Sequence, residues 1–446
     1  MMTALKPYPE YKDSGVEWIG EIPKDWEIIK IKHVAKLING YSFKSDDYTD
    51  QGIPIIRIGD VGGEIDWKST KKVTVEKITD YKKFLIKPND ILIAMTGATI
   101  GKTSVFKASK KALLNQRVGI IRANADYDER FLAYLINSSV FKAQVIFLGD
   151  GGAQENIGTT DIGNINLSIP NNAIQNKISR FLDMKITQVE TLIKEKERLI
   201  ELLEEKRQAI ITETVTKGLD PNVNMKDSGI EWIGEIPEHW EVVKIKYLFD
   251  IKNGGTPKSN EPDYWDDNGI VWITPEDLSL KGYEISDSRR KISYEGLNNS
   301  SATLISEYSI VISTRAPIGN IKYATKKFTT NQGCKSLQKS NVDINELYYF
   351  YLLKEFKNEL QSLGQGTTFL ELSNRSLANF NVPVLPLKEM NELVSRITDI
   401  NKMIDDLIES QKDTINKLKE YRESLIYEAV TGKIDLRDYE GDTSGH

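Results

Sequence analysis

The chain has 446 residues, of which 39% are hydrophobic and 28% charged, and its formal net charge is −6. This balance is typical of a globular protein with room for two to four domains, and the lack of any run of about 18 apolar residues excludes a membrane-spanning helix. The negative charge argues against a protein that grips nucleic acid by bulk positive charge, so any DNA binding must come from local basic patches or be shared with a partner.

Cysteine and histidine are scarce. Cys334 is the one cysteine, and the three histidines are His33, His239 and His446. Neither an internal disulfide nor a zinc site with the usual nitrogen and sulfur ligands is therefore expected. Residues 1–7 lack the apolar core of a signal peptide. These features predict a protein of a reducing cytoplasm, with no metal site and no membrane association.

A segment near the start of the chain, which we call the opening segment, is repeated in the middle. Residues 12–32 return as residues 226–246, with 16 of 21 positions identical. Weaker matches follow in the same order: 96–101 with 314–319, 115–116 with 331–332, 169–170 with 382–383, and 215–218 with 430–433. Each copy is about 200 residues long, too long for a solenoid repeat, so the chain is a duplication of a domain-sized unit.

Between the repeated segments, residues 33–170 and 247–384 predict two divergent domains that mix helices and strands. Short β-branched runs flanked by turn residues predict strands at 53–58, 90–94 and 309–313. Apolar residues at helical spacing predict a helix at 129–147 and another at 344–363.

Each divergent stretch is followed by a long helix. From residue 178, and again from residue 393, apolar positions recur at alternating spacings of three and four over at least four heptads, with charged residues between them. This is a coiled-coil seam, interrupted by Lys196 and Gln411. A helix of about 40 residues spans roughly 60 Å.

The predicted fold class is α+β, with two mixed α/β domains, two long coiled-coil helices and a pseudo-two-fold internal duplication. In chain order, the parts are 1–170 (opening segment and first domain), 171–217 (first long helix), 218–384 (repeated opening segment and second domain), 385–433 (second long helix) and 434–446 (a polar C-terminal tail).

The ordered, doubled motifs resemble the specificity subunit of type I restriction–modification systems over almost the whole chain. The elements that carry the resemblance are the doubled Asp-Ser-Gly-x-Glu-Trp-Ile-Gly-Glu-Ile-Pro motif, the two helices, the closing segments at 213–219 and 428–434, the Gly-Gly-Thr-Pro turn at 254–257 and the Asn-Gln pairs. The resemblance implies that the two domains are target-recognition domains, each reading one half of an asymmetric, bipartite site on double-stranded DNA. It implies that the helices pack antiparallel as a spacer between them.

The same resemblance implies partners and a cellular location. Two modification (methyltransferase) subunits would dock on the repeated parts, restriction subunits would join that core, and adenine methylation or ATP-dependent cleavage would belong to those partners. S-adenosylmethionine, ATP and Mg²⁺ are accordingly expected in the partner subunits and no cofactor in this chain. The cytoplasm would be bacterial or archaeal. No catalytic residue is predicted in this chain.

Base-reading side chains should be arginine, lysine, asparagine, glutamine, serine or threonine on loops, because these match the edge patterns of bases. The candidates in the first domain are Arg57, Lys102, Gln116 and Arg117, and those in the second are Thr256, Lys258, Arg315 and Gln332. An ordinary surface role is the alternative for each of them. Gln116 and Gln332 could instead be buried amides that brace a strand.

Basic clusters are candidates for phosphate contacts, although such runs more often mark a solvated surface. They are Lys68/Lys71/Lys72, Lys82/Lys83, Lys107/Lys110/Lys111, Arg289/Arg290/Lys291 and Lys326/Lys327. Residues 96–103 approach a phosphate-loop pattern but are one residue short of its spacing, so a tight turn that presents Lys102 is the preferred interpretation.

Two features of the repeated opening segments have structural interpretations. Matched tryptophans at 18, 26, 232 and 240 predict packing anchors more than base-stacking platforms. Asp13 and Glu17, with their second copies at 227 and 231, predict capping and docking more than acid–base chemistry, since no histidine or lysine trio lies nearby.

Two other functions remain open on the sequence alone. One is a catalytic DNA methyltransferase or nuclease with a duplicated reader, which the lack of an Asn-Pro-Pro-Tyr or Asp-Pro-Pro-Tyr tetrapeptide and of a full phosphate loop disfavours. The other is a structural coiled-coil adaptor with two protein-binding domains. DNA retention that depends on sequence would separate the adaptor from a DNA reader.

Overall fold

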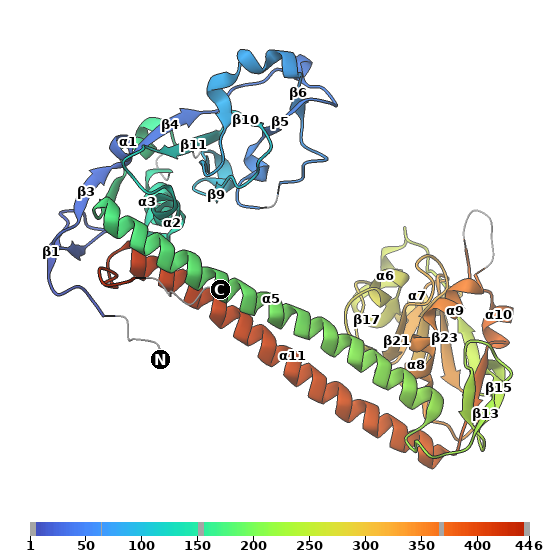
Figure 1. Cartoon of the computed structure of the whole chain (residues 1–446). Helices are drawn as coiled ribbons and strands as arrows, with labels where there is room; N and C mark the ends of the chain where they lie inside the picture. The colour runs from blue at the N-terminus through green and yellow to red at the C-terminus, as the bar shows by residue number, and fades with distance from the viewer. Residues whose placement is uncertain (1–5, 64, 150–155, 365–369, 441–446) are drawn as a thin grey trace. The chain divides into compact units, whose positions relative to one another are not determined.

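In a computed structural model of the chain (Figure 1), the duplicated sequence folds into two units. The strand orders of their sheets correspond, except for one edge strand in each unit. The structure describes residues 6–63, 65–149, 156–364 and 370–440. Unit 1 comprises residues 1–197 and 412–446, and unit 2 comprises residues 198–411. Each unit therefore contains one opening segment, one divergent domain, and parts of both long helices.

The mixed domain of unit 1 contains two sheets, with strand orders β6-β5-β10-β7 and β4-β11-β8-β9. Within the first sheet, β5 and β10 are parallel. The strands of unit 1 are β1 (Tyr11–Asp13), β2 (Glu21–Pro23), β3 (Glu27–Lys30), β4 (Ala35–Asn39), β5 (Ile53–Ile56), β6 (Lys72–Val73), β7 (Leu85–Ile86), β8 (Ile91–Ala94), β9 (Thr103–Val105), β10 (Ala112–Leu114), β11 (Val118–Ala123) and β12 (Asn166–Ile169). Its shorter helices are α1 (Ile31–Val34), α2 (Glu129–Asn137), α3 (Ser139–Gly149) and α4 (Thr159–Gly163).

Unit 2 repeats this plan with the orders β19-β17-β22 and β16-β23-β20-β21-β18, and the parallel pair is now β17 with β22. Its strands are β13 (Met225–Asp227), β14 (Glu235–Pro237), β15 (Glu241–Lys244), β16 (Phe249–Asn253), β17 (Trp265–Ile273), β18 (Glu284–Ile285), β19 (Lys291–Ile292), β20 (Ser309–Ser313), β21 (Ile321–Ala324), β22 (Phe328–Thr330), β23 (Cys334–Lys339) and β24 (Asn381–Val384). Its shorter helices are α6 (Pro275–Leu278), α7 (Tyr294–Asn298), α8 (Glu346–Glu355), α9 (Lys357–Ser362) and α10 (Asn374–Ala378).

The two long helices are α5 (Asn172–Lys217) and α11 (Leu387–Val430), and in each unit they pack against one another. In unit 1, Ile178 and Leu182 share a core with Leu425. In unit 2, Leu203 packs in the cluster that contains Ile404. The N-terminal part of α5 thus packs against the C-terminal part of α11, so the two helices are antiparallel. The apolar seam predicted from the heptads is the face that packs. The seam-breaking side chains of Lys196 and Gln411 are half-buried.

The predicted strands at 53–58, 90–94 and 309–313 correspond to β5, β8 and β20. The two helices predicted inside the divergent stretches are each broken in two, which is a correction. The backbone at Ser138 is extended, and its hydroxyl donates to the Leu135 carbonyl oxygen at 2.6 Å, ending α2. The backbone at Phe356 leaves the helical region, so α8 ends before α9 begins. No single helix among the described residues is long and apolar enough to cross a membrane, although α2 and α3 together, bent by 62°, meet that test by length and composition only.

The stretch predicted as a polar C-terminal tail starts with packed residues. Ile434 and Leu436 are buried in the core of unit 1. Gly432 approaches the opening segment so closely that a Cβ there would lie 2.4 Å from Pro23 Cγ. The segment that follows α11 therefore packs against the first opening segment. Residues 441–446 lie outside the described part of the chain.

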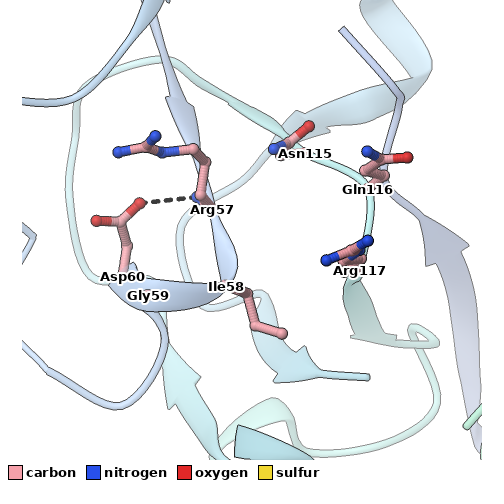
Figure 2. Close-up of a pocket in the computed structure, with 7 residues that line it drawn as sticks. All are labelled: Arg57, Ile58, Gly59, Asp60, Asn115, Gln116 and Arg117. Carbon is pink, nitrogen blue, oxygen red and sulfur yellow. Dashed lines mark hydrogen bonds between the residues drawn. The ribbon is translucent and has the colours of Figure 1, made fainter. Parts of the chain in front are cut away.

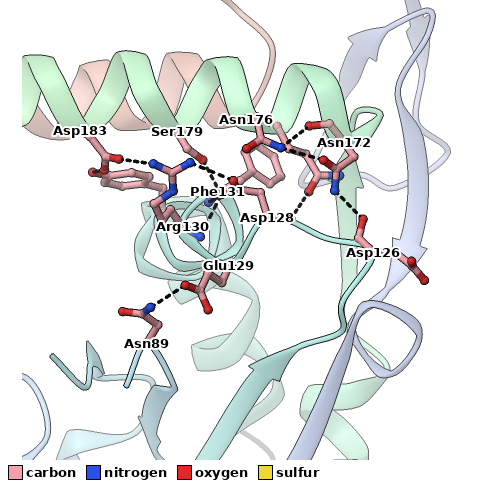
Figure 3. Close-up of polar contacts among 12 residues, drawn as sticks. Asn89, Asp126, Asp128, Glu129, Arg130, Phe131, Asn172, Asn176, Ser179 and Asp183 are labelled. Carbon is pink, nitrogen blue, oxygen red and sulfur yellow. Dashed lines mark hydrogen bonds and ion pairs between the residues drawn. The ribbon is translucent and has the colours of Figure 1, made fainter. Parts of the chain in front are cut away.

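A polar joint fixes the mixed domain of unit 1 to α5 (Figure 3). Asp128 caps α2 by accepting from the backbone N–H groups of Arg130 and Phe131, and it also accepts from the Ser179 hydroxyl on α5 at 2.8 Å. Arg130 then reaches Asp183 on α5 at 2.9 Å. Unit 2 has a neutral counterpart, because Asn345 caps α8 and donates from its side-chain amide to Asn391 on α11.

Acid should weaken this joint. Burial raises the pKa of Asp128, but the hydrogen bonds from Phe131, Ser179 and Arg130 outweigh it, so the pKa of Asp128 lies below its usual 3.8. A lowered folded-state pKa adds stability above pH 3.8 that is lost as the pH falls through the folded value. We expect Asp128→Asn, which copies the cap of unit 2, to lower the free energy of unfolding by about 1 kcal/mol near pH 7. The free energy of unfolding of this variant should also fall less steeply than that of the wild type as the pH is lowered. Urea unfolding of the full chain from pH 7 to pH 3 tests this. A variant whose free energy of unfolding depends on pH as that of the wild type does would contradict it.

Candidate DNA interface

Both units build the same turn at the end of their parallel strand pair. In unit 1 the Asn115 N–H donates to the Ile56 carbonyl at 3.0 Å, and in unit 2 the Asn331 N–H donates to the Ile273 carbonyl at 3.0 Å. The repeated Asn-Gln pairs therefore occupy equivalent places. The glutamines that follow, Gln116 and Gln332, are exposed, so the buried-amide alternative is wrong for both.

Three of the predicted readers of unit 1 meet around one hollow of about 410 Å³, shown in Figure 2. We call it the reader pocket, and its polar members are Arg57, Asp60, Asn115, Gln116 and Arg117. Asp60 accepts the Arg57 backbone N–H at 2.7 Å, which fixes the turn that follows β5. The pocket thus gathers amide and guanidinium donors, the groups that pair with base edges.

The backbone of Arg117 is in the left-handed region, with φ of 70°. Only glycine, asparagine and aspartate adopt this region readily, so arginine is strained there. Strained residues concentrate at functional sites, where surrounding contacts enforce the conformation. Here the Arg117 carbonyl accepts from the Met95 N–H at 2.9 Å, which holds the turn in place.

Lys102 lies apart from the reader pocket. It lines a separate hollow of about 380 Å³ with Gly62 and Lys142. Residues 96–103 follow β8 and lead into β9, which is antiparallel to β8. A phosphate-binding loop leads from a strand into a helix, so the interpretation of this segment as a turn that presents Lys102 fits the backbone.

The predicted readers of unit 2 are more engaged with protein partners. Thr256 hydrogen-bonds to Gln332, which links the Gly-Gly-Thr-Pro turn to the Asn-Gln turn. Arg315 pairs with Glu371 at 3.2 Å, so part of its charge is compensated. Lys258 is exposed. At equivalent turns the two units therefore present different groups, with guanidinium groups around the turn in unit 1 and a hydroxyl–amide pair in unit 2.

A family model for the type I restriction modification DNA specificity domain matches residues 23–202 and again 237–420, which is most of both units. The chain belongs to this family. It is the DNA-specificity subunit of a type I restriction–modification system, and as such it is the recognition component and not the catalytic one.

Relatives of full length agree with this assignment. The specificity subunit is 25% identical over 442 residues to the MjaVIII type I restriction enzyme specificity subunit of Methanocaldococcus jannaschii, covering 94% of this chain and 95% of the relative. A second chain of that organism, provisionally named the MjaX specificity subunit, is 27% identical over 449 residues, covering 98% and 100%.

Two solved structures share the fold. A chain from a structure on complex assembly and conformational transition of the type I R-M system has a TM-score of 0.66 at 17% identity, covering 93% of this chain and 99% of that one. The HsdS subunit from Thermoanaerobacter tengcongensis has a TM-score of 0.53 at 16% identity, covering 93% and 98%.

In addition to the reader pocket, unit 1 of the specificity subunit has a basic surface hollow. A trough of about 720 Å³ in unit 1 is lined by lysines from two of the predicted clusters, Lys82, Lys83 and Lys111, together with Lys36 and Lys87. Arg122 also lines it but is held by Asp90 through two bonds of 2.6 Å, so its charge is already used. We call this the basic trough. Lys36 and Lys87 were not among the basic clusters predicted from the sequence, because neither belongs to a run of basic residues.

The repeated tryptophans of the specificity subunit divide into two kinds. Trp26 and Trp240 are fully buried, as predicted for packing anchors. Trp18 and Trp232 are 50% and 37% exposed, so they are not buried as Trp26 and Trp240 are. Trp232 stacks on Phe380, and Trp18 lies against Phe147.

Two of the repeated acidic residues, Asp13 and Asp227, have a structural role. Asp13 and Asp227 each accept the N–H of the second following residue at 2.9 Å, which closes the same turn in both copies. Across the described ranges, no group of three or more histidine, cysteine, aspartate or glutamate side chains is placed to hold a metal ion.

Proposed function

We propose that each unit of this specificity subunit reads one half of an asymmetric, bipartite DNA site, and that α5 and α11 set the gap between the halves. The observation that carries the proposal is an equivalent turn in both units, with Gln116 in one and Gln332 in the other, that has different neighbouring side chains. They are Arg57 and Arg117 in unit 1 and Thr256 in unit 2. One scaffold with two sets of hydrogen-bonding groups suits two different base sequences.

The partners follow from the parts that do not diverge. The turn at Ser14 and its copy at Ser228 have the same hydrogen bonds, 3.1 Å and 3.2 Å in each, and each turn is followed by a half-exposed tryptophan. Equal surfaces suit equal partners. We therefore propose that two copies of a modification subunit dock on this chain and that restriction subunits join that core. S-adenosylmethionine, ATP and Mg²⁺ would act in those partners, in the cytoplasm.

The test is reconstitution. The full chain, co-expressed with its modification subunits in a host that lacks them, should direct adenine methylation to a single split motif, mapped by sequencing modified bases. The chain alone should methylate nothing. Methylation at unsplit or unrelated sites would overturn the proposal, and an adaptor would leave methylation independent of DNA sequence.

The basic trough should position DNA without reading it. We expect Lys82→Ala, Lys83→Ala and Lys111→Ala together to weaken binding of every duplex by a similar factor and to reduce the slope of log K against log salt by up to about 2.7, since each released counterion contributes about 0.9. Binding of the assembled complex to target and random duplexes between 50 and 200 mM salt measures this. Substitution of Lys326 and Lys327 in unit 2 removes two positive charges instead of three and is compared per charge removed. A changed methylation motif in the trough variant would contradict a positioning role.

A further inference from the structure

The guanidinium of Arg290 in unit 2 lies over an aromatic platform. Its Cζ is 3.4 Å from the ring centroid of Trp265 and 5.6 Å from that of Trp272. The two indoles meet edge to face, with centroids 5.1 Å apart. A guanidinium stacked in this way loses little freedom when it binds, because the ring already restricts its orientation.

The same indoles fix the Gly-Gly-Thr-Pro-Lys loop. Trp272 Nε1 donates to the Gly255 carbonyl at 2.9 Å, and Trp265 Nε1 donates to the Lys258 carbonyl at 3.2 Å. Arg290 therefore sits on the support of the loop that carries Thr256, which in turn bonds Gln332. This chain of contacts places Arg290 with the equivalent turn of unit 2.

The neighbours of Arg290 differ from it in their partners. Arg289 is engaged by Glu276 and by Asp277, whose Oδ1 is 3.1 Å from Nε, and Lys291 pairs with Asp287 at 3.1 Å. Within the part of unit 2 that the structure describes, the Arg290 side chain has neither a hydrogen bond nor an ion pair, and it is exposed. Of the three basic residues at 289–291, Arg290 thus keeps its N–H groups for a ligand.

The strand beneath is bulged. Trp265 and Ile270 both pair with Ile292, so the register of β17 against β19 shifts between them. Bulges bend a strand and re-aim its side chains, and they are common beside functional sites. Here the shift lets Trp265 reach back to the loop while β17 continues to Trp272.

We propose that Arg290 is a base-reading residue of unit 2, held by Trp265 so that its N–H edge bonds O6 and N7 of a guanine in the major groove. The inference rests on the proposed function and names one reader within it. A stacked guanidinium has its face covered and its planar edge free, which is the geometry for bidentate bonding to guanine. A phosphate contact needs only a positive charge, which a lysine without a platform supplies.

The experiment compares Arg290→Lys, Arg290→Ala and Arg289→Lys in the full chain, assembled with its modification subunits. Methylated motifs are mapped, and initial methylation rates are measured on the wild-type site. Arg290→Lys keeps the charge and loses the bidentate edge, so we expect a roughly ten- to hundred-fold slower rate at the wild-type site. The motif should relax at one guanine of one half-site, with the other half-site unchanged. Arg289→Lys should keep the full motif.

Each outcome decides the matter. An unchanged motif in Arg290→Lys and Arg290→Ala overturns the inference, and so does a uniform loss on all duplexes with a smaller salt slope, which marks a phosphate contact. Thermal unfolding of each variant shows that the fold is retained, and Arg290→Lys stays informative if Arg290→Ala unfolds. If the wild-type complex gives no split motif, the proposed function has failed, which is distinct from a failure of Arg290 alone.

Discussion

Replacing Arg57 and Arg117 together with alanine should slow methylation of the wild-type target by at least about thirty-fold in the assembled complex. Both side chains line the reader pocket of unit 1, which Gln116 also lines (Figure 2). A good bidentate contact to a base contributes about 1–3 kcal/mol of discrimination, so two such contacts correspond to about 2–6 kcal/mol. Rates on target duplexes, with the motif mapped afterwards, measure the loss.

The paired lysine variant, Arg57→Lys with Arg117→Lys, separates base reading from charge. It keeps both positive charges, so binding to random duplexes should stay within a few-fold of the wild type, while the half-site read by unit 1 relaxes. The half-site read by unit 2 should not change in either variant, because those groups lie in the other unit. Equal losses on target and random duplexes would show that the pocket holds phosphate and reads no base.

The long helices could be predicted because their information is local. The heptad seam of α5 and α11 is written into consecutive residues, and antiparallel packing buries it as expected. The breaks at Ser138 and Phe356 could not be predicted, because apolar spacing continues through both positions. At both positions the helix ends because of how the domain packs, and the spacing of apolar residues does not indicate such a break.

The reader pocket could not be predicted from the sequence, because it depends on contacts between residues that are distant in the chain. Arg57 and Gln116 are distant in sequence, and the parallel register of β5 with β10 brings them together. Residue type alone selected both as candidates, but it also selected Lys102, which lies in another hollow, and Arg315, which is paired with Glu371. It assigned Arg290 only to a basic cluster, since no sequence pattern indicates that Trp265 supports it. Side-chain chemistry suggests readers, whereas non-local pairing decides which of them meet.

Adding four residues to both long helices should move methylation to sites with a wider gap and abolish it at sites with the native gap. Four helical residues lengthen the path by about 6 Å, close to two base pairs at roughly 3.4 Å each. The insertions belong where the seam is packed within unit 2, beside Leu203 in α5 and Ile404 in α11. A four-residue insertion is a stutter, which a coiled coil absorbs by local unwinding.

The half-site sequences should stay fixed in that variant, because neither the reader pocket nor the turn at Gln332 is touched. An insertion in α5 alone is the matched control. It shifts one side of the seam against the other, so Ile200 and Leu203 lose their places against Ile400 and Ile404, and the complex should lose both gaps. If the double insertion instead keeps the native gap or changes the half-sites, the helices do not set the spacing. The gap would then have to be fixed by the partners, since the two readers in this chain are joined through α5 and α11.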